Sequence, residues 1–363
     1  MRKSWLLIPV SVLAFWGTLA AQTDATQAYY AAQTSYCKYL TEQAAAQRDL
    51  LRSPSLIAGP TQPDTGTPAQ MVFGMSMSLA DLRKASLTMQ TARTGCDLNS
   101  AISEAQLHIY YAMAAIEREV LLHRLDDIAR ASAKLDSMAS EQARLVEVHN
   151  LTRPAVYFLQ SARERLDESR TAALASISVP YAANMSPVPL RVLIAQKQDK
   201  DLENQKALTK LQKENGWDFK VTAGGRSQLG QSNTVATVSS FGAYGAFTVS
   251  YNLGRRAANE HLDASVSPYM TWKTDRFDDI VQQAEVLRKQ IEQTIALQQQ
   301  QLSILLAHDN EITKSLSEFE DVDTSSAVAF RNQLLADRIL LAVDIDDVQF
   351  RLDRLQAYLR DNF

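Results

Sequence analysis

Glycine is missing from two long stretches of this chain. All 12 glycines lie at or before Gly254, and none falls between residues 96 and 215. Because glycine and proline are the residues that most often interrupt helices, these stretches predict very long helices. Residues 80–149 alone, at 1.5 Å per residue, would form a rod of roughly 105 Å. A rod of this length does not fit inside a compact domain of 363 residues, so we expect an elongated, mainly helical protein.

The first residues have the pattern of a secretory signal peptide. Arg2 and Lys3 precede an apolar run from Trp5 to Trp16, which is followed by small residues up to Ala21. The alternative, an uncleaved anchor, is less favoured because a membrane-spanning helix needs roughly 20 apolar residues. The sequence therefore predicts a signal peptide at residues 1–21 and export of the remaining chain.

The chain contains an internal duplication. The pattern F-x-x-S-x-x-L begins at Phe73 and again at Phe247, and T-x-x-A-V-x-F begins at Thr152 and again at Thr324. The two patterns occur in the same order and at nearly the same separation in both halves. We therefore predict two repeats, residues 22–187 and 188–363, each with the order helix, strand, strand, helix.

Alternation of apolar with small or polar residues predicts four strands, at about 55–59, 69–79, 217–226 and 241–253. Long helices are expected at about 80–149 and 255–318, with a bend in the second at Pro268. The apolar positions of the strands form a candidate membrane-facing set: Met71, Phe73, Met75, Met77, Trp217, Phe219, Phe247, Val249 and Tyr251.

Four strands are too few to form a membrane barrel in one chain. Strands in lipid must close into a barrel because an open edge leaves backbone groups unpaired, and the smallest such barrels have about eight strands. We therefore expect a barrel shared between chains. The alternative is a pair of amphipathic hairpins that cap a soluble coiled-coil stalk.

These features resemble the TolC-like outer-membrane efflux proteins. The resemblance lies in Ser53-Pro54-Ser55-Leu56 after the first helix, in the strand-to-helix junction from Phe247 to Arg256, in the T-x-x-A-V-x-F turns and in the duplicated topology. It implies a homotrimer with a twelve-stranded barrel in outer-membrane lipid, on a long periplasmic α-helical barrel. It also implies a Gram-negative outer-membrane location, with most of the mass in the periplasm, and partnership with a periplasmic adaptor and an inner-membrane transporter.

The function that the resemblance implies is an export or efflux channel. Two alternatives remain: a non-conducting structural component of a cell-envelope assembly with the same fold, or a periplasmic coiled-coil adaptor. If three chains meet at the periplasmic tip, two sets of residues become candidates there. The pore or gate candidates are Glu318, Glu320, Asp321 and Asp323, and the adaptor-docking candidates are Thr152, Arg153, Thr324 and Ser325. The alternative for the four acidic residues is that they only keep an exposed turn at the end of the long helix well solvated.

The two cysteines are predicted to form a disulfide bond. Cys37 precedes Pro54 by the same number of residues as Cys96 follows Leu79. Since both helices leave the same hairpin, the two thiols are expected at the same height, and an exported protein meets an oxidising compartment. Two buried free thiols are the alternative.

Catalytic, cofactor-binding and metal-binding motifs are not apparent in the sequence, so we expect neither an enzyme nor a bound cofactor. Gly224-Gly225 lies in a glycine-rich segment, but no Gly-Lys-Ser/Thr follows it. The pairs Asp126-Asp127 and Asp278-Asp279 are interpreted as solvated helix faces. The formal charge of −4, from 37 basic and 41 acidic residues, argues against a nucleic-acid partner.

Overall fold

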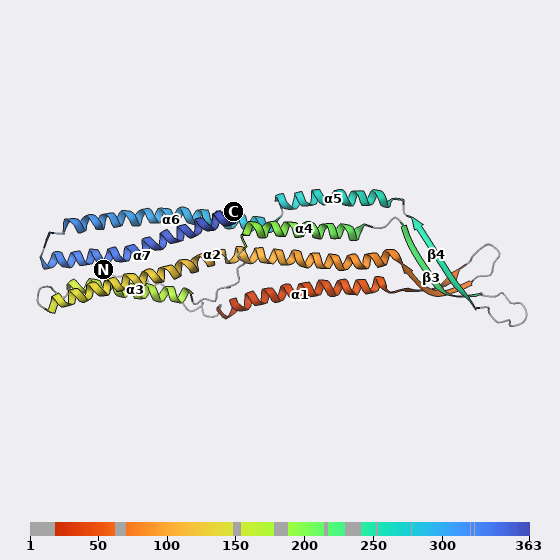
Figure 1. Ribbon diagram of the computed structural model, residues 1–363, viewed down its shortest axis with the longest axis horizontal. Helices are drawn as coiled ribbons and strands as arrows, with labels where there is room; N and C mark the ends of the chain where they lie inside the picture. Colours follow the sequence, from red (N-terminus) through yellow and green to blue (C-terminus); the bar gives the residue numbers. More distant parts are fainter. Residues whose placement is uncertain are drawn as a thin grey trace, which may run out of the picture. The chain divides into compact units, whose positions relative to one another are not determined.

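The chain is mainly α-helical with one small β-sheet, which confirms this part of the predicted fold class (Figure 1). The computed structural model describes residues 19–61, 70–147, 154–177, 188–213, 217–228, 241–251, 253–276, 278–319, 321–322 and 324–363. Most of the predicted signal peptide, residues 1–18, lies outside these ranges.

The described residues form the following elements. The helices are α1 (Leu19–Arg52), α2 (Leu79–Glu147), α3 (Pro154–Ile177), α4 (Leu190–Gln212), α5 (Arg255–Arg276), α6 (Asp279–Glu318) and α7 (Ser325–Asn362). The strands are β1 (Ser55–Thr61), β2 (Gln70–Ser78), β3 (Trp217–Gln228) and β4 (Phe241–Tyr251). With 69 residues, α2 spans about 100 Å along its axis.

The second long helix differs from the prediction. Where the sequence predicts one helix over residues 255–318, the structure has α5 and α6, and Pro268 lies inside α5. The new helix begins just after Asp278, and aspartate is a favoured residue at the position before a helix. Asp278 is also buried and forms an ion pair with Lys197 of α4, so a tertiary contact holds the chain at this point.

The four strands form one antiparallel sheet in the order β1-β2-β3-β4. The two hairpins, β1–β2 and β3–β4, come from opposite halves of the sequence, and β2 pairs with β3 to join them. The register places Gly74 opposite Gly224 and Ser78 opposite Lys220. The strand pairing therefore connects the two predicted repeats.

The chain divides into two compact units. The sheet unit, residues 30–104 and 193–279, contains the sheet, α4, α5 and parts of α1 and α2; the helical unit is formed mainly by residues 105–192 and 280–363. Each unit takes segments from both halves of the sequence. The predicted boundary between repeats near residue 188 is thus a feature of the sequence and stays a prediction.

In the sheet unit, α2 is tied to two other helices. A disulfide bond joins Cys37 of α1 to Cys96 of α2, with their Cα atoms 5.1 Å apart, as the spacing of the cysteines predicts. Beside it, Thr94 Oγ1 lies 3.1 Å from Asn204 Oδ1 of α4. Gly95 lies between these contacts, where a Cβ would sit 3.6 Å from the Leu40 side chain. These contacts fix α1, α2 and α4 together below the sheet.

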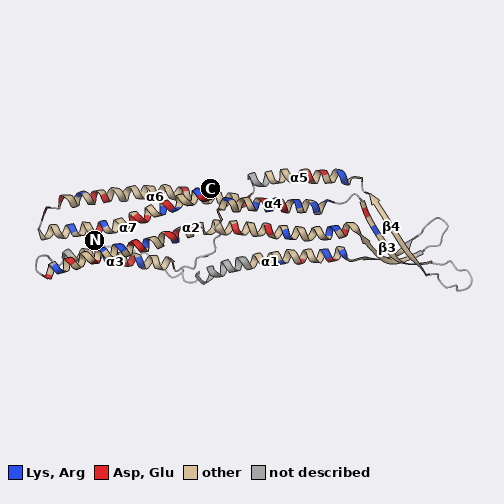
Figure 2. Cartoon of the chain, in the orientation of Figure 1, with Lys and Arg blue, Asp and Glu red and all other residues tan. Residues whose placement is uncertain are grey.

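The helical unit has an apolar core at which α2, α3 and α7 meet. Its fully buried centre includes Ile128, Leu135 and Leu159. At its margin Arg124 of α2 donates to Asp344 at 3.0 Å and to Asp347 at 3.1 Å, both of α7 (charged residues are coloured in Figure 2).

Two carboxylates that the sequence analysis interprets as solvated are buried. Asp127 is 3% exposed and lies beside Arg130 and His123, whose Nδ1 is 3.3 Å from the carboxylate. Asp278 is 4% exposed and is paired with Lys197. The interpretation was wrong for these two residues because their partners are one turn away or on another helix, and a run of adjacent acids does not reveal them.

Among the described helices, none has the length and apolarity needed to cross a membrane.

Candidate functional site

The two faces of the sheet differ sharply in chemistry. Residues that pair across antiparallel strands lie on the same face, so the register sorts every strand position into one of two sets. We call the first the apolar face, and within the described strands it contains all nine predicted membrane-facing residues. Its large side chains are Leu56, Met71, Phe73, Met75, Met77, Trp217, Phe219, Val221, Phe247, Val249 and Tyr251.

The apolar face is the exposed one. Leu56 is 82% exposed, Phe247 64% and Met75 56%. The second set, which we call the polar face, includes Ser76 and Thr222, and both are buried. A sheet in a water-soluble protein buries its apolar face and exposes its polar one, so this arrangement is reversed where β2 pairs with β3. On the polar face of β4, Thr248 and Ser250 are exposed.

Aromatic residues collect at the end of the apolar face nearest the helices. Trp217 and Tyr251 stand opposite each other in the ladder with ring centroids 4.6 Å apart. Phe219 continues the row, 6.3 Å from Trp217 and 6.0 Å from Phe247. Aromatic girdles of this kind mark the two interfaces of membrane β-structures.

The polar face is crowded at its centre. A Cβ on Gly74 would lie 2.6 Å from the carbonyl oxygen of Ala223, and a Cβ on Gly224 would overlap the carbonyl oxygen of Phe73. Only glycine allows the two backbones to approach in this way. The glycine at position 224 of β3 is therefore explained by strand packing.

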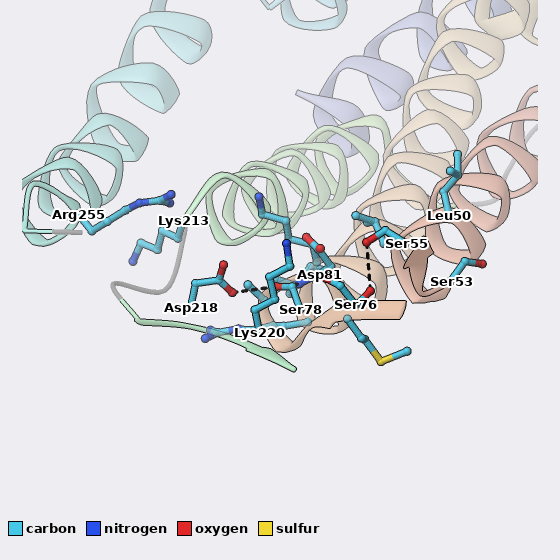
Figure 3. Close-up of a pocket in the computed structure, with 16 residues that line it drawn as sticks. Leu50, Ser53, Ser55, Ser76, Ser78, Asp81, Lys213, Asp218, Lys220 and Arg255 are labelled. Atoms are coloured by element: carbon cyan, nitrogen blue, oxygen red, sulfur yellow. Dashed lines mark hydrogen bonds between the residues drawn. The ribbon is translucent and has the colours of Figure 1, made fainter. Parts of the chain in front are cut away.

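A cavity of about 380 Å³ opens where the polar face meets α2 (Figure 3). We call it the junction cavity. Its polar lining comes from β1, β2, α2, β3, α5 and the segments that follow α1 and α4: Ser53, Ser55, Ser76, Ser78, Asp81, Arg83, Lys84, Lys213, Asp218, Lys220 and Arg255.

Hydrogen bonds order one wall of this cavity. Ser78 precedes α2, and its Oγ donates to Asp218 Oδ1 at 2.8 Å and accepts from the Asp81 backbone N at 3.4 Å. On the other side, Ser55 Oγ donates to the carbonyl oxygen of Ser76 at 3.1 Å. Ser78 therefore connects the start of α2 to β3 across the β2–β3 pairing.

The cavity carries more positive than negative charge. Five cations and two carboxylates line it, and one of the cations, Lys213, forms an ion pair with Asp263 of α5. This cluster is not apparent from the sequence because its members are far apart in the chain.

The predicted tip residues are partly described. Glu318 ends α6 and is exposed, as are Asp321 and Ser325. Thr324 caps α7, since its Oγ1 accepts from the backbone N of Ala327 at 3.3 Å. In the second half of the chain, the first and fourth positions of the T-x-x-A-V-x-F pattern, Thr324 and Ala327, thus form a helix cap. Four of the predicted tip residues lie outside the described residues: Thr152, Arg153, Glu320 and Asp323.

No protein-family model matches the sequence, and a search of curated proteins finds no relative. Among solved structures, the chain is similar to the outer-membrane channel OprN, at 12% identity over 96% of this chain and 92% of that one, with a TM-score of 0.39. It is similar to the Neisseria gonorrhoeae channel MtrE in its open state at 14% identity over 91% and 84%, with a TM-score of 0.39. It is similar to the Campylobacter jejuni channel CmeC at 12% identity over 90% of this chain and 83% of that one, with a TM-score of 0.34.

These three solved structures are outer-membrane channels, the class that the sequence motifs resemble. Since their TM-scores are below 0.5, the function proposed below rests on the residues of this chain.

Proposed function

We propose that this chain is one subunit of an export channel in the outer membrane of a Gram-negative bacterium. The observation that carries the proposal is the exposed apolar face, which runs across the paired strands, while Ser76 and Thr222 on the opposite face are buried. Lipid is the environment that favours an exposed apolar face, and a water-filled pore favours the polar face. The predicted signal peptide supports export of the chain.

The sheet edges support assembly from several chains. Within the described residues, β1 and β4 each pair with one neighbour and form the two edges of the sheet. In lipid those edges need partners, and β4 of one subunit beside β1 of the next would supply them. Three subunits, the number that the family resemblance implies, would give a barrel of twelve strands.

The helices would then form the periplasmic part of the conduit. The acidic tip residues, including Glu318 and Asp321, would surround the periplasmic opening in a trimer, and a ring of acids attracts cations. Beside them Thr324 and Ser325, with Thr152 and Arg153, would dock a periplasmic adaptor that connects the channel to an inner-membrane transporter.

Adjacent residues of β4 offer a direct test. Phe247 lies on the apolar face and Ala246, opposite Thr222, on the polar face. A lysine facing lipid near the bilayer centre costs about 2–4 kcal/mol, whereas one facing a water-filled pore costs far less. We expect Phe247→Lys to remove the detergent-extractable oligomer from outer-membrane fractions and Ala246→Lys to retain it. Equal loss in both variants, or in neither, would contradict the assignment of the faces.

Conductance separates the channel from the alternatives. The purified wild-type oligomer is expected to give discrete conductance steps in planar bilayers. A membrane-bound oligomer that never conducts would favour the non-conducting structural component. A protein that stays in the soluble fraction after lysis, without detergent, would favour the periplasmic adaptor or the soluble stalk.

A further inference from the structure

We infer that the sheet unit carries a second contact between subunits, in which α1 of one chain packs against α5 of the next. The partner of this surface is therefore a second copy of the same chain. This inference rests on the multi-chain barrel of the proposed function, because a ring of subunits brings the two edges of the sheet unit together. It continues the strand contact between β4 and β1 into the helices.

The helices of the sheet unit follow the order of its strands. Side-chain contacts connect α1 to α2, α2 to α4 and α4 to α5 (Figure 1). The contacting pairs are Cys37 with Cys96, Thr94 with Asn204, Lys213 with Asp263 and Lys197 with Asp278. Within the described residues, α1 and α5 are thus the end helices of this row, as β1 and β4 are the end strands of the sheet.

The helix α1 exposes a stripe that contains no charged residue. Its members follow one another at intervals of three and four residues, so they share one face of the helix. They are Tyr36, Tyr39, Gln43, Ala46 and Leu50, and we call them the α1 stripe. All five are exposed, Tyr39 to 59% and Leu50 to 77%. This spacing of large apolar side chains is typical of a seam that packs against another helix.

The helix α5 exposes a complementary stripe of smaller residues. Ala257, His261, Ala264 and Pro268 follow one another at the same intervals, are all exposed, and form what we call the α5 stripe. Half-buried Leu262 and Val266 lie on the opposite side of this helix, toward the rest of the row. Large side chains on one helix and small ones on the other allow two helices to interdigitate closely.

The two stripes also lie at matching heights. Each helical residue rises 1.5 Å and neighbouring helices of the row run in opposite directions, so the contacts between them relate positions on α1 to positions on α5. They place Leu50 level with His261 and Gln43 level with Pro268. In a ring, each subunit is related to the next by a rotation about the ring axis, which leaves these heights unchanged. The same residues therefore meet when α1 contacts α5 of the next chain.

Cysteine cross-linking tests this contact directly. The two native cysteines are bonded to each other, so only introduced thiols react. We expect Leu50→Cys/His261→Cys and Gln43→Cys/Pro268→Cys to form disulfide-linked multimers when the oligomer is oxidised in detergent.

The matched controls exchange the partners, as Leu50→Cys/Pro268→Cys and Gln43→Cys/His261→Cys. They should form no multimers, because His261 and Pro268 are about two turns, or about 10 Å, apart along α5, beyond the reach of a disulfide bond. Multimers from the exchanged pairs at equal yield, or from no pair at all, would overturn the inference.

A charge placed in the α5 stripe provides a second test. Ala264→Glu should lower the temperature at which the oligomer dissociates, because the new carboxylate would be buried in the contact. Ser265→Glu, at the adjacent exposed position outside the stripe, should leave this temperature unchanged. Equal effects of the two substitutions would contradict the contact.

Two outcomes separate this inference from the proposed function. A conducting oligomer in which the thiol of Leu50→Cys reacts with a maleimide as fast as in the unfolded chain would overturn the helical contact and leave the channel in place. The α1 stripe would then be open to a different protein. Cross-linking of the matched pairs alone, in an oligomer that never conducts, would instead overturn the channel and support the contact.

Discussion

The buried ion pair between Lys197 and Asp278 makes the sheet unit sensitive, near the end of α5, to the loss of either charge. Their side chains are only 3% and 4% exposed, so both charges have lost most of their hydration. Removing one partner of a buried pair leaves the other charge unpaired and costs about 3–5 kcal/mol. Removing both charges together often changes the free energy of unfolding very little.

Three variants isolate this effect. Lys197→Met leaves a buried carboxylate, and Asp278→Asn leaves a buried ammonium while keeping a residue favoured before a helix. The double variant removes both charges. We expect each single variant to be strongly destabilised and the double variant to recover most of the loss.

Hydrogen exchange of the α4 and α5 amides measures local opening of this region. Because each 1.4 kcal/mol changes an equilibrium tenfold, a loss of about 3–5 kcal/mol accelerates exchange by about two to four orders of magnitude. The control is Lys200→Met, which removes an exposed pair with Glu203 on the same helix and should leave exchange unchanged. Exchange in the double variant as fast as in the singles would refute the unpaired-charge reasoning. Unchanged exchange in Asp278→Asn would show that the pair contributes nothing.

Three further outcomes are expected. Cys37→Ala/Cys96→Ala should lower the free energy of unfolding by up to about 4 kcal/mol, because the disulfide bond closes a loop with a separation of 59 residues. Denaturant titrations of the wild type and the double variant measure this loss, and identical unfolding midpoints would contradict the prediction. Burial raises the pKa of Asp347 against the attraction of nearby arginines, so the folded state holds this proton more tightly than the unfolded state. Stability from this group is therefore present below its ordinary pKa of 3.8 and is lost as pH rises through the raised value. Asp347→Asn should therefore gain stability relative to the wild type as the pH rises above 3.8, and melts at several pH values measure this gain. Neutralising Glu318 and Asp321 should shift reversal potentials toward anion selectivity; an unchanged potential would assign these acids to a surface or docking role.

Local patterns in the sequence predict much of the fold. The absence of glycine predicts α2 and α6, and alternation predicts the strands and the residues that share the apolar face. The cysteine pairing follows from equal distances to the hairpin because a helix has a fixed rise per residue. These predictions succeed because each depends on residues close together in one element, or on two elements that start from the same turn.

The remaining features depend on contacts that no local pattern contains. The end of α5 falls near Asp278 and not at Pro268 because Lys197, on another helix, binds the aspartate there. The junction cavity likewise depends on contacts between residues that are distant in the sequence. Alternation assigns Ser78 and Lys220 to faces within their own strands, but only the pairing of β2 with β3 places them opposite each other.

That pairing depends in turn on Gly74 and Gly224, whose backbones approach too closely for any side chain. Gly224→Ala should therefore accelerate hydrogen exchange of the β2 and β3 amides, because the added methyl group overlaps the Phe73 carbonyl oxygen and separates the two strands. Gly245→Ala, on the neighbouring strand in open space, provides the control and should leave exchange unchanged. Equal exchange rates in both glycine variants would mean that the pairing of β2 with β3 does not depend on Gly224.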